Sequence, residues 1–332
     1  MEKVIVENLF NGDREAQIQA AMELSRLNTK QRHNLAERGV MAPLISMLHS
    51  EDFEAIEAAL HALLSLAFGS ERNKNRIVKA GALPLLLNLL QCQSQALVEI
   101  TVAAMLILSS CTANKLAIAS SGAIKLLIEF LNENNENSTS RQGMLDAIST
   151  LHNLSTSQQI VPLIVSSGVI FSLLQLIHSS GKSSELVEKA VGLLENVVSS
   201  SEDALCQTAS IGSGIRILVE TIEDGTSQSK EHAVGILLLI CQSCREKYRG
   251  MILREGVMPG LLQLSVDGTR RAKSVARELL LLLRDCSSYC SRNKISNHEL
   301  IEQIMQEIDA EGEELVGTTL RLVEEMIAKL ST

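Results

Sequence analysis

The decapeptide GALPLLLNLL (Gly81–Leu90) carries the pattern that decides the fold. A glycine is followed by a small or apolar residue and then by pairs of Leu, Ile or Val. Four further copies are GVMAPLISML, GAIKLLIEFL, GVIFSLLQLI and GVMPGLLQLS, which start at Gly39, Gly122, Gly168 and Gly256. A weaker copy, GSGIRILVETI, starts at Gly212 and places Ser213 at the glycine position. Successive copies lie 41 to 46 residues apart, a period typical of helical repeat arrays.

Each copy stands between two other helical segments. A short helix precedes it, as in RNKNRIVKA (Arg72–Ala80), and a longer one follows, as in EAIEAALHALLSLAFG (Glu54–Gly69). Apolar residues in the longer segment recur at spacings of three and four, which predicts one buried helix face. The glycine falls where the chain turns sharply, because a left-handed backbone is cheap only without a Cβ. The unit is therefore a first helix, a glycine turn, a second helix and a long third helix.

No such unit can bury its own apolar face, so neighbouring units must stack. We expect an all-α fold, a right-handed α-solenoid with helical N- and C-terminal caps. A cap helix is predicted within residues 1–28, six repeats within 29–286, and an acidic helical cap or tail within 287–332. The six units are placed at residues 29–69, 70–112, 113–157, 158–201, 202–245 and 246–286.

Composition agrees with stacked helices and excludes several classes of protein. Aromatic residues make up only 2% of the 332 residues, so the core must consist of Leu, Ile, Val and Ala. A net charge of −9 argues against a nucleic-acid binder, which needs a basic face. The first residues do not predict a secretory signal, and no apolar stretch approaches the roughly 18 residues of a membrane span. Seven cysteines, mostly in apolar helical stretches, are interpreted as reduced core thiols, consistent with the cytoplasm or nucleus.

Two segments resemble the armadillo repeats, above all the armadillo region of plant U-box proteins and their armadillo-only relatives. AMELSRLNTKQRHNLAERGVMAPLISML (Ala21–Leu48) resembles the first repeat of that region, and TRRAKSVARELLLLLRD (Thr269–Asp285) resembles its last. The resemblance covers residues 13–286. It departs from the ubiquitin ligases of the group in one respect, because residues 1–12 are too few to form a U-box. We therefore expect an armadillo-only relative or a fragment, without ligase activity of its own.

The resemblance implies a non-catalytic scaffold or adaptor that binds a protein or peptide segment along a concave groove of third helices. Members of the family often place an Asn on the third helix to bind the peptide backbone, and its amide suits this role by both donating and accepting hydrogen bonds. Only Asn153 and Asn196 match that position. No aromatic residue other than a histidine stands at the position where importin-alpha has Trp, so binding of nuclear-localisation signals of that kind is not expected.

Asn153 and Asn196 are predicted to bind a partner segment, with His152, Glu195 and Lys189 nearby. The alternative is that both asparagines satisfy backbone groups of neighbouring helices. Gly192 and Gly235 stand at equivalent positions of adjacent units and are predicted to leave the groove floor open there. The alternative for this glycine pair is that it eases close packing of the helices.

A basic cluster near the C-terminal end of the groove forms a second candidate site. It consists of Arg270, Arg271, Lys273 and Arg277. One interpretation is an acidic or phosphorylated ligand, since Arg side chains pair well with such groups. The other is pairing with the chain's own acidic tail, because residues 296–332 contain nine acidic residues against Arg321 and Lys329. Basic residues on the first helices, among them Lys74, Arg245 and Arg249, are expected to face outward.

No cofactor, metal site or catalytic group is predicted. Cys241 and Cys244, and likewise Cys286 and Cys290, have spacings that superficially suggest zinc, but they fall at helix ends rather than in tight turns. The seven histidines are scattered, and no nucleophile elbow or phosphate loop is present. The second functional hypothesis is substrate recognition within a U-box-type ubiquitin ligase system, with the chain as a ligase component.

Overall fold

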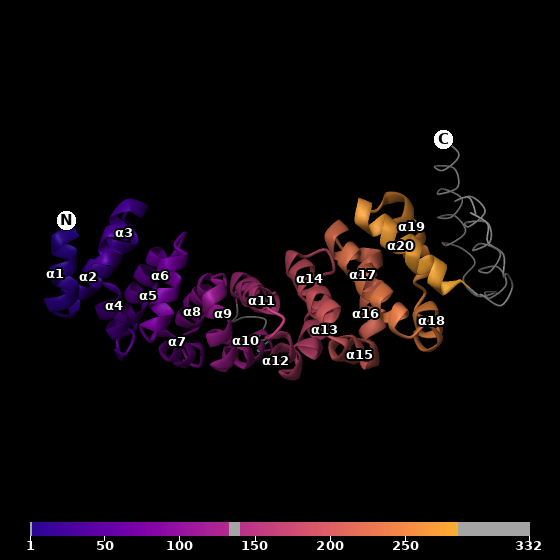
Figure 1. The fold of residues 1–332 in the computed structure, drawn as a ribbon, viewed down its shortest axis with the longest axis horizontal. Helices are drawn as coiled ribbons and strands as arrows, with labels where there is room; N and C mark the ends of the chain where they lie inside the picture. The colour runs from indigo at the N-terminus through magenta and orange to yellow at the C-terminus, as the bar shows by residue number, and fades with distance from the viewer. Residues whose placement is uncertain (1, 133–139, 285–332) are drawn as a thin grey trace. The chain divides into compact units, whose positions relative to one another are not determined.

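The computed structural model describes residues 2–132 and 140–284. These residues form twenty α-helices and no β-strand (Figure 1), so the predicted all-α class is confirmed. By its internal contacts the chain divides into an N-terminal unit, Met1–Leu176, and a C-terminal unit, Ile177–Thr332.

The helices follow one another in triplets after an initial pair. The pair consists of α1 (Glu2–Asn11) and α2 (Arg14–Ser25). The first helices of the triplets are α3 (Thr29–Glu37), α6 (Glu71–Lys79), α9 (Thr112–Ser120), α12 (Val161–Ser166), α15 (Glu202–Ser210) and α18 (Arg245–Arg254). The second helices are α4 (Met41–Met47), α7 (Ala82–Leu90), α10 (Ala123–Asn132), α13 (Val169–Ser179), α16 (Gly214–Asp224) and α19 (Met258–Asp267). The third helices are α5 (Phe53–Ala67), α8 (Gln95–Ser109), α11 (Arg141–Ser155), α14 (Glu185–Ser200), α17 (Ser227–Ser243) and α20 (Arg270–Leu283).

The N-terminal cap contains two helices where the sequence predicts one. Helix α1 packs against α2 and buries Ile5 and Leu9 completely. Those two residues are one helical turn apart and are too few to register as a periodic pattern. The predicted cap or tail at residues 287–332 lies outside the described residues.

The glycine turn has the predicted backbone conformation in five of the six repeats. Gly39, Gly81, Gly122, Gly168 and Gly256 have φ between 75° and 92°, the left-handed region that disfavours other residues. The weak copy departs from this rule, because Ser213 has a φ of −105°. In that repeat Ile211 is extended, with φ −66° and ψ 121°, and the chain turns without a left-handed residue.

Third helices pack against one another within each unit. In the N-terminal unit α2 contacts α5, α5 contacts α8, and α8 contacts α11; in the C-terminal unit α14 contacts α17 and α17 contacts α20. Their buried faces consist mainly of Leu, Ile, Val and Ala, as the composition predicts. Among the helices of the described residues, none combines the length and apolarity that crossing a membrane requires.

Candidate partner-binding surface

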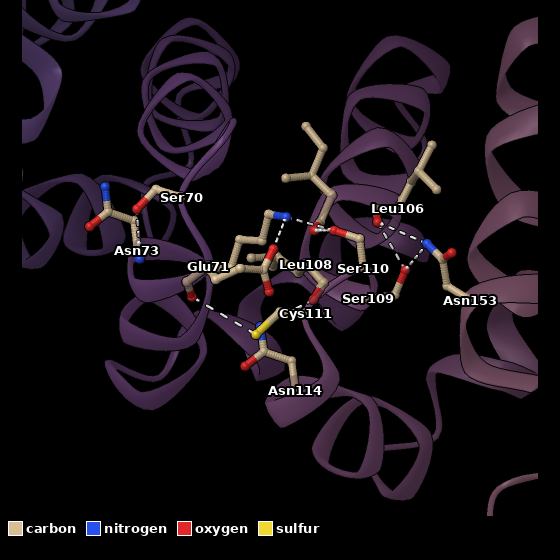
Figure 2. A network of polar contacts seen from close by, with 12 residues as sticks. Ser70, Glu71, Asn73, Leu106, Leu108, Ser109, Ser110, Cys111, Asn114 and Asn153 are labelled. Carbon is tan, nitrogen blue, oxygen red and sulfur yellow. Dashed lines mark hydrogen bonds and ion pairs between the residues drawn. The ribbon is translucent and has the colours of Figure 1, made fainter. Parts of the chain in front are cut away.

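Asn153 lies half-buried on α11 and faces the C-terminal end of α8. Its Nδ2 donates to Ser109 Oγ at 3.1 Å and to the Leu106 carbonyl at 3.5 Å (Figure 2). Ser109 Oγ in turn donates to the same Leu106 carbonyl at 2.9 Å. A chain of neutral hydrogen bonds therefore joins the two third helices.

These contacts match the structural alternative for Asn153, since its amide nitrogen satisfies groups of the neighbouring helix. No hydrogen bond reaches Asn153 Oδ1 from the residues that the structure describes, so the acceptor half of the amide remains for a ligand. His152 is exposed beside it on α11.

Glu195 of α14 forms the centre of a charged cluster in the C-terminal unit. His232 Nδ1 of α17 lies 2.6 Å from its Oε2, and Arg271 Nη2 of α20 donates to its Oε1 at 2.6 Å. Arg271 Nη1 also donates to Glu231 Oε1 of α17 at 3.3 Å. Three successive third helices therefore meet at one carboxylate, and we call Glu195, His232, Arg271 and Glu231 the Glu195 cluster.

Burial and hydrogen bonding act on Glu195 in opposite directions. The side chain is only 12% exposed, and this burial by itself raises the pKa of its carboxyl group. The hydrogen bonds from His232 and Arg271, with their positive charge, outweigh burial and lower the pKa below its ordinary value. Glu195 is therefore held as a carboxylate at neutral pH.

Gly192 and Gly235 do not leave an open floor between the third helices. A Cβ added at Gly235 would stand 2.3 Å from Glu195 Oε1, so the carboxylate fills the space beside this glycine. A Cβ at Gly192 would contact His232 Nε2 at 3.4 Å. The prediction of an open floor is wrong, because the side chains of Glu195 and His232 lie beside the two glycines.

Asn196 and Lys189 also lie on α14. Asn196 is half-buried, and its backbone carbonyl accepts hydrogen bonds from Ser199 Oγ and Ser200 Oγ. Lys189 is exposed. Neighbouring Glu188 instead accepts a hydrogen bond from Thr226 Oγ1 at 2.8 Å.

The predicted basic cluster divides into two parts. Arg271 belongs to the Glu195 cluster and is neutralised by Glu195 and Glu231. Arg270, Lys273 and Arg277 instead line a shallow depression along α20, together with Ser274, Glu278 and Leu281. Sequence proximity grouped the four cations, but a helix directs consecutive side chains to different faces.

First-helix cations do not all face outward. Lys74 of α6 is buried, and its Nζ donates to Glu71 Oε1 at 2.5 Å and to Ser110 Oγ at 2.8 Å, beside the end of α8 (Figure 2). Arg245 Nε and Arg249 Nε of α18 donate to the Leu282 and Leu283 carbonyls of α20, at 2.5 and 2.6 Å. Cations here stabilise third-helix C-termini, where unpaired carbonyls and the helix dipole favour positive charge.

The described residues contain no group of three or more His, Cys, Asp and Glu side chains arranged to bind a metal ion. Cys241 is buried in α17, and Cys244, which follows that helix, is exposed; both are free thiols. Cys286 and Cys290 lie outside the described residues.

Sequence reasoning did not find His232 or Glu231, although one signal for the Glu195 cluster exists. Two glycines in the middle of amphipathic third helices cost helix stability, so each requires a reason. The reason at Gly235 is a carboxylate from the preceding third helix.

Comparison with known proteins agrees with the repeat architecture. Residues 101–305 match the family described as the plant U-box protein ARM repeat region, and residues 70–110 match the Armadillo/beta-catenin-like repeat. U-box domain-containing protein 45 of Arabidopsis thaliana is 30% identical over 260 residues, covering 76% of this chain and 32% of that protein. U-box domain-containing protein 17 of the same plant is 31% identical over 284 residues, covering 83% and 37%. The chain thus spans about a third of the length of these two relatives.

Solved structures give the same fold. An engineered protein superimposes with a TM-score of 0.73 at 20% identity, covering 99% of this chain and 78% of that one. A designed armadillo repeat protein in complex with the peptide (KR)4 has a TM-score of 0.53 at 18% identity, covering 84% and 98%. The predicted fold class, an all-α solenoid of armadillo repeats, is confirmed.

Proposed function

Since this chain belongs to the plant U-box ARM repeat family, we propose that it is a non-catalytic protein-binding module whose third helices bind a segment of a partner protein. Armadillo repeats generally bind proteins, and a designed member of the fold binds a peptide. A repeat array suits this role because equivalent side chains recur along its length and can contact successive parts of one extended segment.

The Glu195 cluster is the observation that carries the proposal. It fixes side chains of three successive third helices at hydrogen-bonding distance, so the surface around it needs little reordering when a partner binds. Lys189 and Asn196 flank Glu195 on α14, and Lys189 supplies an exposed cation. In the N-terminal unit, Asn153 Oδ1 and His152 offer a further acceptor and an exposed ring.

Substrate recognition within a U-box-type ubiquitin ligase system is the second candidate function. It is favoured by the likeness to U-box proteins, of which this chain covers about a third. Under this alternative the chain supplies the substrate-binding part, and a U-box supplied separately recruits the conjugating enzyme.

Site-specific photo-crosslinking in plant cells tests the binding surface. A photoreactive residue at Lys189, exposed on a third helix, is expected to form covalent adducts with a discrete partner. The matched control is Lys125, an exposed lysine of the second helix α10, where no adduct with the same protein is expected. Equal adducts at both positions, or adducts at Lys125 alone, contradict the assignment of the third-helix surface.

The partner identified in this way allows two further tests. Asn153→Ala combined with Asn196→Ala is expected to weaken its capture without unfolding the array, whereas unchanged capture removes both asparagines from the binding surface. Purified chain incubated with ubiquitin, activating enzyme and conjugating enzyme is expected to transfer no ubiquitin. Transfer under these conditions contradicts the non-catalytic assignment.

A further inference from the structure

Three pairs of successive third helices, α8 with α11, α14 with α17 and α17 with α20, are joined at their N-termini by a similar polar contact. Glu99 Oε1 of α8 accepts from the backbone N–H of Ser140, which caps α11, at 2.9 Å. Glu188 accepts from the hydroxyl of Thr226, the cap of α17, and Glu231 accepts from the hydroxyl of Thr269. In each pair, the carboxylate lies four or five residues after the N-cap of its own helix. It accepts a hydrogen bond from the N-cap residue of the next third helix.

The carboxylate also suits this place electrostatically, because a helix N-terminus carries unpaired N–H groups and partial positive charge. Partial burial opposes ionisation of Glu99, yet the hydrogen bonds from Ser140 lower its pKa below the ordinary value. We call this recurring pair of groups the N-cap contact.

Helix α20 lacks the carboxylate that would extend this series. Thr269 caps α20, so the fourth and fifth positions beyond the cap are Lys273 and Ser274. Arg270 and Arg277 lie in the same row, and with Leu281, which is 54% exposed, they line one shallow depression. This row, the α20 face, is basic where α8, α14 and α17 have a carboxylate.

The carboxylates near the α20 face are already paired. Glu231 accepts from Thr269 and Arg271, and Glu278 accepts from Gln242 Nε2 at 2.8 Å. Arg277 donates to the Ser265 carbonyl at 3.2 Å. Arg270 and Lys273 have no carboxylate partner among the residues that the structure describes, so the face carries unneutralised positive charge beside an exposed leucine.

We propose that the α20 face binds the acidic segment 296–332 of the same chain. This segment has nine acidic residues against Arg321 and Lys329, and it also contains Leu and Ile residues that suit Leu281. The eleven residues 285–295 link it to the end of α20 and can reach up to about 38 Å, whereas the 14-residue α20 is about 21 Å long. Covalent linkage makes the local concentration of the segment high enough to exclude most separate ligands.

The proposal does not rest on the proposed function, since the α20 face is separate from the Glu195 cluster. It resolves the two interpretations of the basic cluster in favour of the chain's own acidic residues, and it leaves the surface around Lys189 for the partner.

Zero-length carbodiimide coupling of the purified 332-residue chain tests the contact, because it joins an amine only to a carboxylate beside it. We expect mass spectrometry to find Lys273 joined to carboxylates within Glu299–Glu325. The ion pair of Lys182 with Glu220, 3.2 Å apart, provides an internal reference in the same sample. A sample in which the Lys182 product forms and the Lys273 product does not overturns the proposal.

Matched charge variants test whether the basic row is responsible. Arg270→Glu with Arg277→Glu keeps the Lys273 amine but is expected to abolish its coupling to the acidic segment. Arg26→Glu with Arg38→Glu makes the same change in net charge at exposed sites of the N-terminal unit and is expected to leave the coupling intact. Coupling that survives in the first variant contradicts the proposal. Equal circular dichroism spectra confirm that both variants fold.

Two other occupants of the α20 face, a second copy of the chain and a separate acidic ligand, would give different results. In an equal mixture of unlabelled and ¹⁵N-labelled chains, we expect products within single chains only; mixed-label products would mean that a second copy is bound, against the proposal. A synthetic phosphorylated acidic peptide is expected not to compete at concentrations near that of the protein. Loss of the intrachain product at such concentrations would show that the face is open to a separate acidic ligand.

Discussion

The two units join their third helices through different chemistry. In the N-terminal unit, an amide and a hydroxyl link α11 to α8, through Asn153 Nδ2 and Ser109 Oγ. In the C-terminal unit, a buried carboxylate accepts from both a histidine and an arginine, across α14, α17 and α20. Asn153 and Asn196 stand at the same place in the repeat, and in the C-terminal unit the residue before Asn196, Glu195, makes charged contacts with two further third helices.

This difference teaches that the repeat fixes the helices and not the contacts between them. A neutral hydrogen bond contributes modestly and responds little to salt, whereas a charged cluster contributes more and depends on pH. We therefore expect the two units to respond differently to substitution and to pH.

Removal of the Glu195 carboxylate should have the largest effect. Glu195→Ala is expected to lower the free energy of unfolding by about 2 kcal/mol, because His232 and Arg271 both lose a charge-assisted partner. Urea unfolding with circular dichroism measures the loss, and hydrogen exchange locates it in α14, α17 and α20. Glu185→Ala at an exposed site on α14 is the control and should change stability by less than about 0.5 kcal/mol. Equal losses for the two variants contradict the importance of the cluster.

A methyl group at Gly235 should have the next largest effect. Gly235→Ala is expected to cost about 1–2 kcal/mol, because the new Cβ collides with Glu195 Oε1. Gly250→Ala is the matched control: its Cβ meets nothing within 4 Å in helix α18, so it should stabilise the chain by about 0.5–1 kcal/mol.

A double-mutant cycle sharpens this test. In the Glu195→Ala background, Gly235→Ala should cost almost nothing, since the colliding carboxylate is gone, and the two substitutions should be non-additive by about 1–2 kcal/mol. Additive losses would mean that the glycine is required for another reason.

Acid should remove the stabilisation that the Glu195 carboxylate gives to the C-terminal unit. The pKa of Glu195 is lowered in the folded chain, so its stabilisation is fully present above the unfolded value, about 4.3, and is lost as pH falls through the lower folded value. The stability difference between the unmodified chain and Glu195→Gln should shrink over that acidic range. A difference that is constant from pH 7 to pH 3 contradicts the charged interpretation.

Asn153→Ala should have the smallest effect. It removes a neutral hydrogen bond and is expected to cost about 0.5–1 kcal/mol, with little change between low and high salt. Ser109→Ala in the same background should add little, because the two side chains act together. A loss that equals that of Glu195→Ala, or that falls with salt in the same way, erases the distinction between the units.

Local features of the fold were predictable because each depends on residues that are close together in the sequence. The repeat places a glycine at each sharp turn, and Gly81, with a φ of 90°, adopts the conformation that only glycine tolerates well. The same reasoning fails at Ser213, because a turn can also form through an extended residue such as Ile211. Helix α1 was missed since Ile5 and Leu9 provide only one turn of periodic signal.

The helix on which each candidate residue lies was predictable from the sequence, but the contacts of those residues were not. The repeat register correctly assigned Asn153, Glu195 and Lys189 to third helices, and the contacts of Asn153 match one of the two interpretations offered. Arg271 was grouped with its neighbours in sequence, although its partner Glu195 lies 76 positions away. The repeat pattern of a single sequence does not show which residues are paired across such a separation.

The sequence by itself determined the helix triplets, the left-handed glycine turns and the apolar faces, since each depends on spacing within a few turns of chain. Only the tertiary structure decided which side chains meet: Glu195 with His232 and Arg271, and Gly235 as the room for that carboxylate. The physical reason is distance, because hydrogen bonds and ion pairs act over about 3 Å, and stacking alone brings residues of different repeats that close.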